Sequence, residues 1–531
     1  MSQLFYQLAG SADPFRTGTI MRISAGGVRS YHKPADDTDA ARGDALQAAK
    51  TAASTNPGDE IHLVPGRTYS ISTPASFSVD NLRFYGHGAT VKQLAAQDYC
   101  LSFNAATAGT EQVVEDLNLN VNGTAVTVTS ERGEGMRLFG NGRVYVRRCN
   151  VYDAPVSASG SCIFAYGTGK KVIEDTTAEN PGWACIHIRS YDCDVINCRA
   201  LVSTAKVGAT KQRFIDMDAA NFGHVRIQGG SWWTDQAINA QAVFDPGSGF
   251  NASKVTVDGV DINCGANCTN HTSGEGVIKP DEITQFVMTN CTQRHSAANF
   301  VYLLWLGPAC DHVTVSDVHA SGVIHAGDGS GINIEECYVN RSSFGRGCTD
   351  AVKHAMTNVR AYRYLQLTNN KYYNLIGSGT QAAGLRGAFE NLNASSDNFV
   401  RMLDCHFDSN WSETAYLFRV IPAIGYLGFD GITVNNRGSG MVLAPTPAQR
   451  LMGGGSYGDP FTARLQWRAI RNATTLAPLS LTTWDHGHPQ PSDTTPWGTL
   501  TGPPGSKIRN MDPEGNSLQA EWNLDGSGDF V

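Results

Sequence analysis

A short pattern of residues recurs along the chain, and it constrains the fold more than any other feature. It reads apolar, any, apolar, two polar, a small residue or Cys, any, apolar. Clear copies lie at 144–151, 286–291, 332–339 and 400–407, and weaker ones at 225–232, 255–262 and 313–320. The place of Cys149 is taken in later copies by Thr176, Cys198, Gly230, Val260, Cys291, Val318 and Cys337. Repeats at steps of 19 to 32 residues indicate stacked structural units.

The alternation inside each copy is that of a β-strand, which points successive side chains to opposite faces. One strand-sized unit cannot bury its apolar face alone, so the units must stack on one another. The small residue at the equivalent place suits a tight corner. The sequence therefore predicts an all-β fold, a single-stranded parallel β-helix in which each repeat is one coil.

Composition agrees with this class and limits the partners. The chain has 531 residues, 56 of them Gly, and only 17% are charged, which favours turns and strands over helices. The net charge of −8 and the lack of a long basic run predict no nucleic-acid partner. Residues 1–8 lack the charged start and apolar run of a signal peptide, and no apolar stretch reaches membrane-spanning length, which predicts no membrane insertion.

The 13 cysteines form no compact disulfide framework. Several occupy the repeat position, so we expect buried, reduced thiols in a chain that folds in a cytoplasm. The pairs Cys193/Cys198 and Cys264/Cys268 could instead bind a metal, but a place at coil corners explains them better.

Patterning along the chain predicts three domains. Residues 1–30 form an N-terminal arm, 31–445 the β-helix with a capping helix at 41–55, and 446–531 a small β-rich C-terminal domain. The helix presents Leu46, Ala49 and Ala53 on one face, and 56–58 (Asn-Pro-Gly) ends it.

A family resemblance rests on residues 27–70. The segments 27–31, 36–40 and 64–69, with the helix between the last two, resemble the N-terminal signature of pectate-lyase-like right-handed β-helix proteins; residues 32–35 depart from it. Within that superfamily the chain is similar to bacteriophage tailspikes, since it has a short N-terminal arm and its closing segments 502–507 and 522–528 resemble those of many phage spike and fibre proteins. The resemblance implies a right-handed β-helix that forms a homotrimer in a virion tail and acts on a bacterial surface polysaccharide. It also implies that the arm binds a phage tail or baseplate protein, and that the C-terminal domain serves trimerisation or carbohydrate binding.

A candidate site follows from aligning the strand that precedes each repeat. If Ile, Leu, Met and Ala point inward, successive coils present outward pairs on one face. These pairs are Arg137/Phe139, Phe164/Tyr166, His187/Arg189 and Asp216/Asp218. The face would combine aromatic rings, a base, a cation and two carboxylates.

Two carboxylates on one face are what glycoside hydrolysis requires, one as acid and the other as base or nucleophile. We therefore assign catalysis to Asp216, Asp218, His187 and Arg189, and substrate binding to Arg137, Phe139, Phe164 and Tyr166. A polysaccharide lyase would instead use Arg189 beside a uronate, with His187 or a tyrosine as base. A spike that only binds its receptor needs the same groove without turnover, and the residues could also be ordinary solvated strand positions.

Three further residues are candidates for substrate binding. Trp232 and Trp233 follow a Gly pair near the same face, and Glu275 lies in an insertion that could overhang the groove. All three could equally have packing or solvent roles. The sequence predicts no cofactor and no metal site. The segment 485–488 (Asp-His-Gly-His) contains residues that can bind a metal, but no further cluster of such ligands accompanies it.

Overall fold

The computed structural model divides the chain into two compact units, 1–270 and 271–531. The residues that it describes are 20–24, 29–125, 133–157, 160–209, 212–218, 223–238, 240–245, 254–265, 267–268, 276–295, 302–307, 310–326, 334–346, 356–357, 362–375, 399–409, 418–419, 426–436, 452–453, 464–468, 471–472, 507–509 and 521–523.

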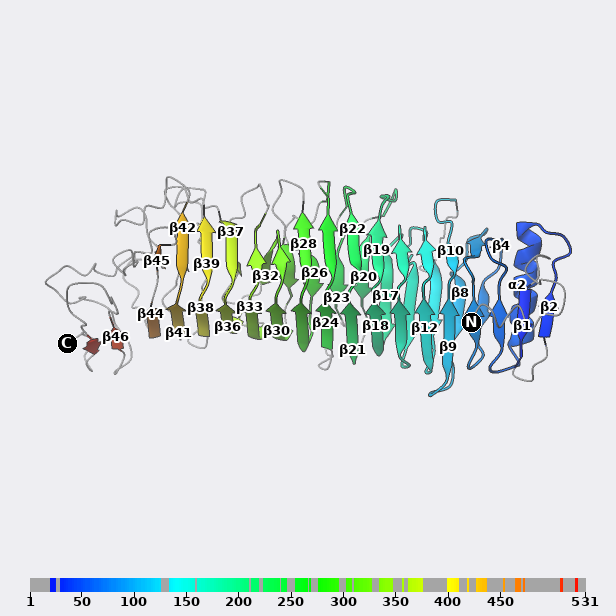
Figure 1. Ribbon diagram of the computed structural model, residues 1–531, viewed down its shortest axis with the longest axis horizontal. Coiled ribbons are helices and arrows are strands. Elements are labelled where there is room, and N and C mark those ends of the chain that lie inside the picture. Colours follow the sequence, from blue (N-terminus) through cyan, green and yellow to red (C-terminus); the bar gives the residue numbers. More distant parts are fainter. Residues whose placement is uncertain are drawn as a thin grey trace. The chain divides into compact units, whose positions relative to one another are not determined.

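Unit 1–270 is a parallel β-helix whose coils contain three strands each. From β3 onward, each strand of the unit pairs in parallel with the strand three places later, one coil further on, so three sheets form (Figure 1). The first sheet contains β3 (Glu60–His62), β6 (Arg83–Tyr85), β9 (Glu111–Glu115), β12 (Arg143–Arg147), β15 (Lys171–Glu174), β18 (Asp192–Ile196), β21 (His224–Gln228) and β24 (Lys254–Asp258). The second contains β4 (Thr68–Ile71), β7 (Thr90–Gln93), β10 (Asn118–Asn120), β13 (Asn150–Tyr152), β16 (Thr177–Glu179), β19 (Arg199–Val202), β22 (Ser231–Thr234) and β25 (Asp261–Cys264). The third contains β5 (Ala75–Phe77), β8 (Tyr99–Asn104), β11 (Glu134–Phe139), β14 (Ile163–Gly167), β17 (Ala184–Ser190), β20 (Arg213–Met217) and β23 (Ala242–Phe244).

Unit 271–531 repeats this architecture. Its first sheet contains β27 (Gln285–Thr289), β30 (Cys310–Ser316), β33 (Ile334–Asn340), β36 (Tyr362–Thr368), β38 (Phe399–Leu403), β41 (Tyr426–Asp430) and β44 (Arg464–Arg468). Its second contains β28 (Thr292–His295), β31 (His319–Ala320), β34 (Ser343–Phe344), β37 (Lys371–Leu375), β39 (His406–Ser409), β42 (Thr433–Asn436) and β45 (Arg471–Asn472). Its third contains β26 (Gly276–Pro280), β29 (Tyr302–Leu306), β32 (Val323–Ala326) and β35 (Met356–Thr357). The all-β parallel β-helix is therefore confirmed.

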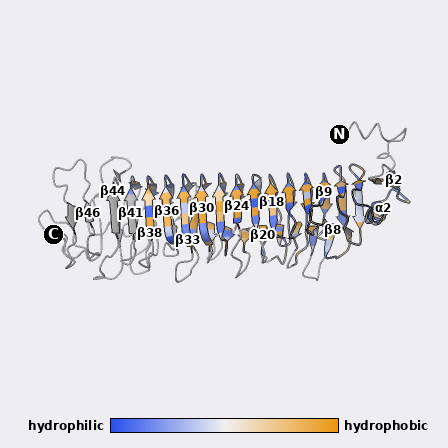
Figure 2. Cartoon of the chain, turned by 90° about the horizontal axis from the view of Figure 1, so that it is seen from below, coloured by the Kyte–Doolittle hydropathy of each residue, from blue (hydrophilic) through white to orange (hydrophobic). Residues whose placement is uncertain are grey.

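Apolar side chains alternate with polar ones along these strands, and the apolar set faces the inside of each coil (Figure 2). In β12, for example, Val144 and Val146 are fully buried while the residues between and beside them are not. Each coil thus buries the apolar side chains that it cannot cover alone against the coils before and after it.

The corner between the first and second sheets explains the sequence repeat. At each corner one residue adopts a left-handed conformation, such as Arg148 (φ 50°) or Asn197 (φ 50°). The next residue, Cys149 or Cys198, is buried inside the coil. Thr176 takes this position on the coil between these two cysteines. Its hydroxyl accepts a hydrogen bond at 3.3 Å from the buried backbone N–H of Cys149. The repeat position is thus the first inward position after the turn.

One copy of the repeat was assigned incorrectly. Cys337 lies inside β33 and pairs with Val313, so it is a strand position and not a corner. The true equivalent is Ser342, which is buried and follows the left-handed Arg341. The error arose because β33 is seven residues long. The apolar spacing of the repeat therefore also occurs within this strand, five residues before the corner residue Ser342.

The described cysteines are buried, and none of them forms a disulfide. Burial raises the pKa of the Cys149 and Cys198 thiols to about 12. They therefore stay protonated and act as small apolar side chains. None of the helices in the described part of the chain has the length and apolar character that a membrane-spanning helix needs.

The predicted capping helix is α2 (Asp39–Ala53), shifted two residues toward the N-terminus. Thr38 is its N-cap and accepts a hydrogen bond from the backbone N–H of Ala41, which fixes the start. Leu46, Ala49 and Ala53 are buried, as the sequence predicts, and α2 packs against β4 and β5.

The predicted arm is in part a piece of sheet. Strands β1 (Ile20–Ile23) and β2 (Arg29–His32) pair antiparallel, and β1 also pairs antiparallel with β3. Residues 20–23 therefore continue the first sheet. Residues 1–19 lie outside the described part, and attachment to a virion stays a prediction.

The predicted boundary at residue 445 does not coincide with the end of parallel pairing. Strands β44 and β45 lie beyond it, yet pair in parallel with β41 and β42. Further short pairs are β40 (Phe418–Arg419) with β43 (Met452–Gly453), and β46 (Lys507–Arg509) with β47 (Glu521–Asn523). The separate C-terminal domain stays a prediction.

Candidate functional site

The third sheet of unit 1–270 carries the candidate site. Its strands pair in the register that the sequence alignment predicts, with Met136 opposite Ile163, Ile163 opposite Ile186, and Ile186 opposite Ile215. The side chains one position further on therefore form a row across four coils. This row is Arg137, Phe164, His187 and Asp216.

A second row lies two positions further along the same strands. Tyr166 is opposite Arg189, and the ring of Phe139 stacks on that of Tyr166 with centroids 5.4 Å apart. Asp218 lies directly after β20 and receives hydrogen bonds from Arg189. Phe139, Tyr166 and Asp218 are exposed, so this row forms the outer surface.

His187, Arg189 and Asp218 form one hydrogen-bonded group. His187 Nε2 lies 2.7 Å from Asp218 Oδ1. Arg189 donates from Nε to Asp218 Oδ1 at 2.5 Å and from Nη2 to Oδ2 at 2.7 Å. Asp218 is thus held on both oxygens, while about a third of its side chain (36%) stays exposed.

Asp216 occupies a different environment from the one predicted. It was expected to be an outward, solvent-facing carboxylate, but it is completely buried. Trp183 Nε1 donates to its Oδ2 at 2.5 Å, and Arg213 donates to its Oδ1. The Arg213 guanidinium also lies 4.5 Å from the centre of the Trp183 ring. These two side chains cover the carboxylate and exclude water.

Trp183 and Arg213 are the residues that the sequence reasoning missed. Each lies at the start of a third-sheet strand, where the repeat pattern does not extend. Their segments are tied together, since Gln212, which is buried, donates to the backbone carbonyl of Pro181 at 2.7 Å. The one signal in the sequence was their position. Trp183 lies four residues before His187, and Arg213 lies three residues before Asp216.

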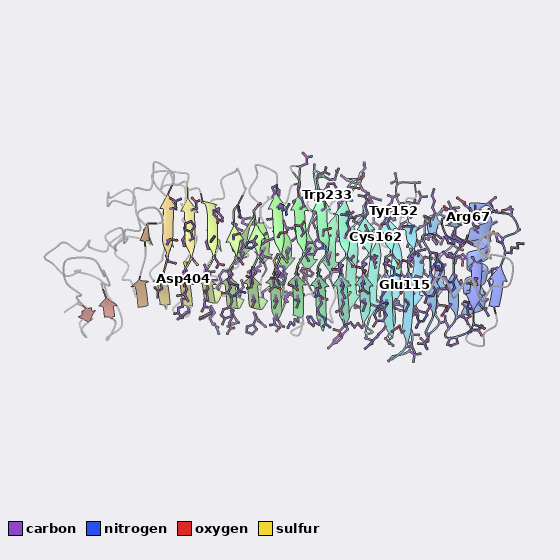
Figure 3. The ribbon with its side chains drawn as sticks, in the orientation of Figure 1. Arg67, Glu115, Tyr152, Cys162, Trp233 and Asp404 are labelled. Carbon is purple, nitrogen blue, oxygen red and sulfur yellow. The ribbon has the colours of Figure 1, made fainter. Side chains whose placement is uncertain are left out.

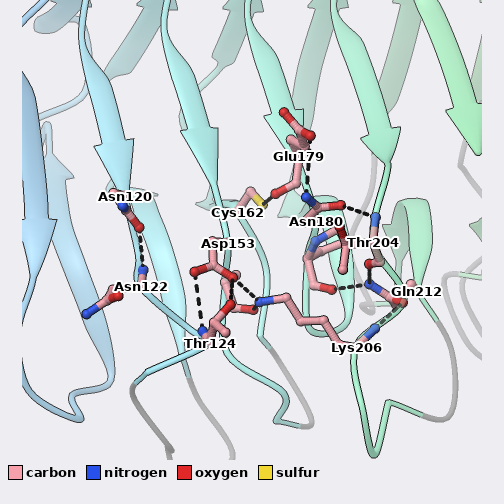
Figure 4. Close-up of polar contacts among 12 residues, drawn as sticks. Asn120, Asn122, Thr124, Asp153, Cys162, Glu179, Asn180, Thr204, Lys206 and Gln212 are labelled. Carbon is pink, nitrogen blue, oxygen red and sulfur yellow. Dashed lines mark hydrogen bonds and ion pairs between the residues drawn. The ribbon is translucent and has the colours of Figure 1, made fainter.

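A polar network at the second sheet fixes the segment that leads to Arg213 (Figure 4). Lys206 Nζ donates to Asp153 Oδ1 at 2.6 Å, and the backbone N–H of Lys206 donates to Gln212 Oε1 at 3.1 Å. Asn180 accepts from the backbone N–H of Thr204 at 2.9 Å. The loop between β19 and β20 is thus anchored before it delivers Arg213 to Asp216.

The hydrogen bonds decide the ionisation of Asp218. Its partial burial opposes ionisation, but the bonds from Arg189 and His187 outweigh that cost and hold the pKa of Asp218 well below its usual range. The bond to Asp218 in turn raises the pKa of Arg189. Asp218 is therefore a carboxylate near neutral pH, which can attack a carbon or hold a water molecule by a hydrogen bond but cannot donate a proton.

His187 is also buried, with 1% of its side chain exposed. The Phe164 ring packs against it at 4.8 Å, and its Nε2 lies 3.8 Å from Asp216 Oδ2 in addition to its contact with Asp218. Its Nδ1 has no hydrogen-bond partner among the residues that the structure describes. The imidazole Nε2 therefore contacts Asp218 directly, whereas Asp216 lies beyond hydrogen-bond distance from it.

A groove of about 510 Å³ adjoins this group on the outer face of the third sheet. It runs from β5 to β17, four strand spacings or roughly 20 Å at about 4.8 Å each. Its lining is Ser76, Ser78, Tyr99, Ser102, Asn104, Glu134, Arg137, Phe139, Phe164, Tyr166 and Arg189. All four residues predicted for substrate binding on this face, Arg137, Phe139, Phe164 and Tyr166, are among them.

Two of the remaining predicted binding residues, Trp232 and Trp233, do not join this site. Trp232 and Trp233 lie on β22 in the second sheet, and Trp233 is labelled there in Figure 3. Trp232 is 2% exposed and packs against Phe214 inside the coil. The prediction that they lie near the third-sheet face was wrong. Each coil contains one strand of every sheet, so residues close in sequence can lie on different sheets. Glu275 lies outside the described residues.

The geometry alone could hold a metal ion. One ligand atom each of His187, Asp216 and Asp218 lies within 4.8 Å of the others. However, Arg189 and Arg213 each donate to one of the two carboxylates, so two guanidinium groups already balance their charge. A divalent cation would have to displace both arginines. The donor set therefore suits proton transfer better than metal binding.

Comparison with known proteins adds one structural likeness. No protein-family model matches the sequence, and no curated protein sequence does. The structure is similar to the "Mannuronan C-5 epimerase AlgE6 A-module" of Azotobacter vinelandii, with a TM-score of 0.32 and 12% sequence identity. The likeness covers 83% of this chain and 96% of that chain. At this level of similarity the fold assignment rests on the strand pairings themselves.

Proposed function

We propose that the chain binds a polysaccharide in the third-sheet groove and hydrolyses it beside Asp218. One observation carries this proposal: an extended groove lined by hydroxyl, amide and aromatic side chains reaches Arg189, which holds an exposed, ionised carboxylate. Clefts with this mixture of groups are the usual form of ligand sites. A fixed carboxylate at one end supplies the reacting group.

Asp218 is the base or nucleophile of the proposed reaction. Its depressed pKa keeps it ionised, and Arg189 fixes the orientation of both oxygens. His187 contacts the same Oδ1 of Asp218 and helps to hold it in place. Arg137, Phe139, Phe164 and Tyr166 bind the saccharide along the groove.

Asp216 is a positioning residue in the structure as it stands. Its nearest oxygen lies within 4.8 Å of that of Asp218, close to the roughly 5–5.5 Å that separates the carboxyl groups of retaining hydrolases. Two donors cover it, however, so contact with a substrate requires Arg213 to move away. In the closed arrangement Asp216 orients Trp183, Arg213 and His187.

The proposed experiment measures two products on a panel of purified bacterial O-polysaccharides and capsular polysaccharides. New reducing ends without ultraviolet absorbance of an unsaturated sugar indicate hydrolysis. Absorbance of such a sugar indicates β-elimination, which the sequence left open. Binding without either product indicates a receptor-binding protein without turnover. Elimination is disfavoured because Arg189, the cation it needs for a uronate, is already bound to Asp218.

The variant Asp218→Asn tests the assignment of the reacting group. We expect cleavage to fall by about 10²-fold or more, the usual contribution of a positioned acid–base group. The matched control is Asp116→Asn, because Asp116 accepts two hydrogen bonds from Arg148 at 2.7 and 3.1 Å in the first sheet. Equal rates in wild type and Asp218→Asn would remove Asp218 from the mechanism.

The biological setting is a further part of the proposal. The likeness of the closing segments 502–507 and 522–528 to those of phage spike and fibre proteins supports a tailspike in a virion tail that acts on a bacterial surface polysaccharide. It also supports a homotrimer bound to a phage tail or baseplate protein through its N-terminal residues. Light scattering of the purified chain tests the trimer, and loss of cell-surface polysaccharide after treatment of host cells tests the target.

A further inference from the structure

The charged side chains of the groove are already paired with one another. Arg137 donates from Nε to Glu134 Oε2 at 3.0 Å and makes a second contact from Nη2. Its guanidinium lies 4.2 Å from the centre of the Tyr99 ring. Arg189 is held in the same way by both oxygens of Asp218. Each arginine therefore faces a carboxylate of this chain.

The pair at the centre of the groove is difficult to open. The side chain of Glu134 is 2% exposed and that of Arg137 is 15% exposed. An anionic ligand that recruited Arg137 would leave Glu134 buried without its cation. Breaking a buried ion pair by removing one partner is strongly unfavourable, because the remaining charge has lost its hydration.

The other described residues of the lining are uncharged. It offers hydroxyl and amide groups at one end and aromatic rings in the middle. These residues are Ser76, Ser78, Ser102, Asn104, Tyr99, Phe139, Phe164 and Tyr166. Hydroxyl and amide groups can exchange hydrogen bonds with sugar hydroxyls, while the rings can pack against sugar C–H groups.

We infer that the saccharide in this groove is uncharged along the stretch that contacts β8 to β17. This inference rests on the proposed function and narrows its substrate class. The two arginine–carboxylate pairs cancel in charge, so the groove offers no net attraction to a polyanion. A uronate or phosphate in that stretch would compete with Glu134 or Asp218 for an arginine.

The first test sorts the polysaccharide panel by the charge of the repeating unit. We expect the bound members to be uncharged, with Kd values that change less than about twofold between 0.05 and 0.3 M NaCl, because no counterions are released. A polyanionic member that binds this groove, and whose affinity falls about tenfold or more with salt, would overturn the substrate class but leave the proposed function intact. Absence of binding to every member would overturn both.

The second test creates a free cation by design. Glu134→Gln keeps the shape of the side chain but releases Arg137 from its partner. We expect this variant to bind polygalacturonate at low salt at least about tenfold more tightly than wild type, which is 1.4 kcal/mol. The control is Glu115→Gln, which removes a carboxylate bound to Arg148 at 2.9 Å in the first sheet and gives no gain at the groove.

Two outcomes of the second test would overturn the inference. One is tight, salt-sensitive binding of polygalacturonate by the wild type. The other is a correctly folded Glu134→Gln variant, checked by its thermal unfolding, with no gain over wild type. If Glu134→Gln does not fold, the binding measurements on the polysaccharide panel still test whether the saccharide is uncharged.

Discussion

Two groups of arginines and carboxylates lie on different sheets of unit 1–270, and they differ in one physical respect. The third-sheet cluster is defined as His187, Arg189, Arg213, Asp216 and Asp218. The first-sheet network is defined as Glu115, Asp116, Arg147, Arg148 and Glu174. Residue types and contact distances are alike. In the network every side chain is 17–50% exposed, whereas in the cluster His187 and Asp216 are nearly or completely buried.

This difference shows that burial, and not charge pattern, separates a candidate site from a solvated surface. Exposed ion pairs are screened by water and contribute about 0–1 kcal/mol each. Buried groups interact in a medium of lower dielectric constant and lose much if one partner is removed. The cluster also adjoins an aromatic groove, whereas strand register places the network on another sheet.

The largest expected effect compares Asp216→Ala with Asp116→Ala. Removing Asp216 leaves the Trp183 N–H and the Arg213 guanidinium without their acceptor, so we expect a loss of about 3 kcal/mol in the free energy of unfolding. Removing Asp116 leaves a half-exposed Arg148 that water can solvate, and Ala is strained at the φ of 55° found there, so the loss should be at most about 2 kcal/mol. Urea unfolding at neutral pH measures both.

Asp216→Asn sharpens this result. The amide oxygen can still accept from Trp183, but the amide N–H group would face the Arg213 donor and the charge is absent, so only a part of the lost stability should return. Equal losses in Asp216→Ala and Asp116→Ala would mean that Asp216 is hydrated, which contradicts the contrast between the two groups.

A smaller effect concerns polysaccharide binding, compared between an aromatic ring of the third sheet and one of the second sheet. Tyr166→Ala removes an exposed ring of the groove, so the Kd of a bound polysaccharide should rise about tenfold, since an aromatic contact contributes about 0.5–1.5 kcal/mol. Trp233→Ala removes a ring of the second sheet and should leave the Kd unchanged. Isothermal calorimetry measures both variants. A loss of affinity confined to Trp233→Ala would move the binding site to the second sheet.

The fold could be predicted from sequence because one local rule repeats. Each corner needs a residue that tolerates a left-handed conformation and then a small inward residue, and each strand needs alternation. The rule failed at Cys337, where a longer strand reproduced the spacing outside a corner. It also could not show that residues 20–23 join the first sheet, because antiparallel pairing of β1 depends on contacts outside any repeat.

The site was predicted only in part, for a related physical reason. Strand register follows from periodicity, so the rows containing His187, Asp216 and Tyr166 could be aligned correctly. Burial depends on what covers a side chain, and Trp183 and Arg213 come from non-repeating segments. Periodicity therefore predicted which residues are neighbours but not that Asp216 is enclosed.

A third prediction concerns pH. The pKa of Asp218 is depressed in the folded chain, so the stability it contributes is complete above the unfolded value of 3.8 and is lost as pH falls toward the folded value. The difference in unfolding free energy between wild type and Asp218→Asn should stay constant from pH 8 to about 5 and shrink below about 4. Because Asp218 is partly exposed, the difference should not exceed about 1 kcal/mol. A difference that already shrinks between pH 7 and 5 would show that the pKa is not depressed.

The smallest expected effect is that of salt on individual ion pairs. Double-mutant cycles give the coupling energy of Arg148 with Asp116 and of Arg213 with Asp216. Raising NaCl from 0.1 to 1 M shortens the screening length from about 10 to about 3 Å, so the first coupling, a few tenths of a kcal/mol, should fall toward zero. The second should keep most of its value, because ions do not reach a side chain with no exposed surface. If both couplings fell together, water and ions would have access to Asp216, and the distinction on which the candidate site depends would be lost.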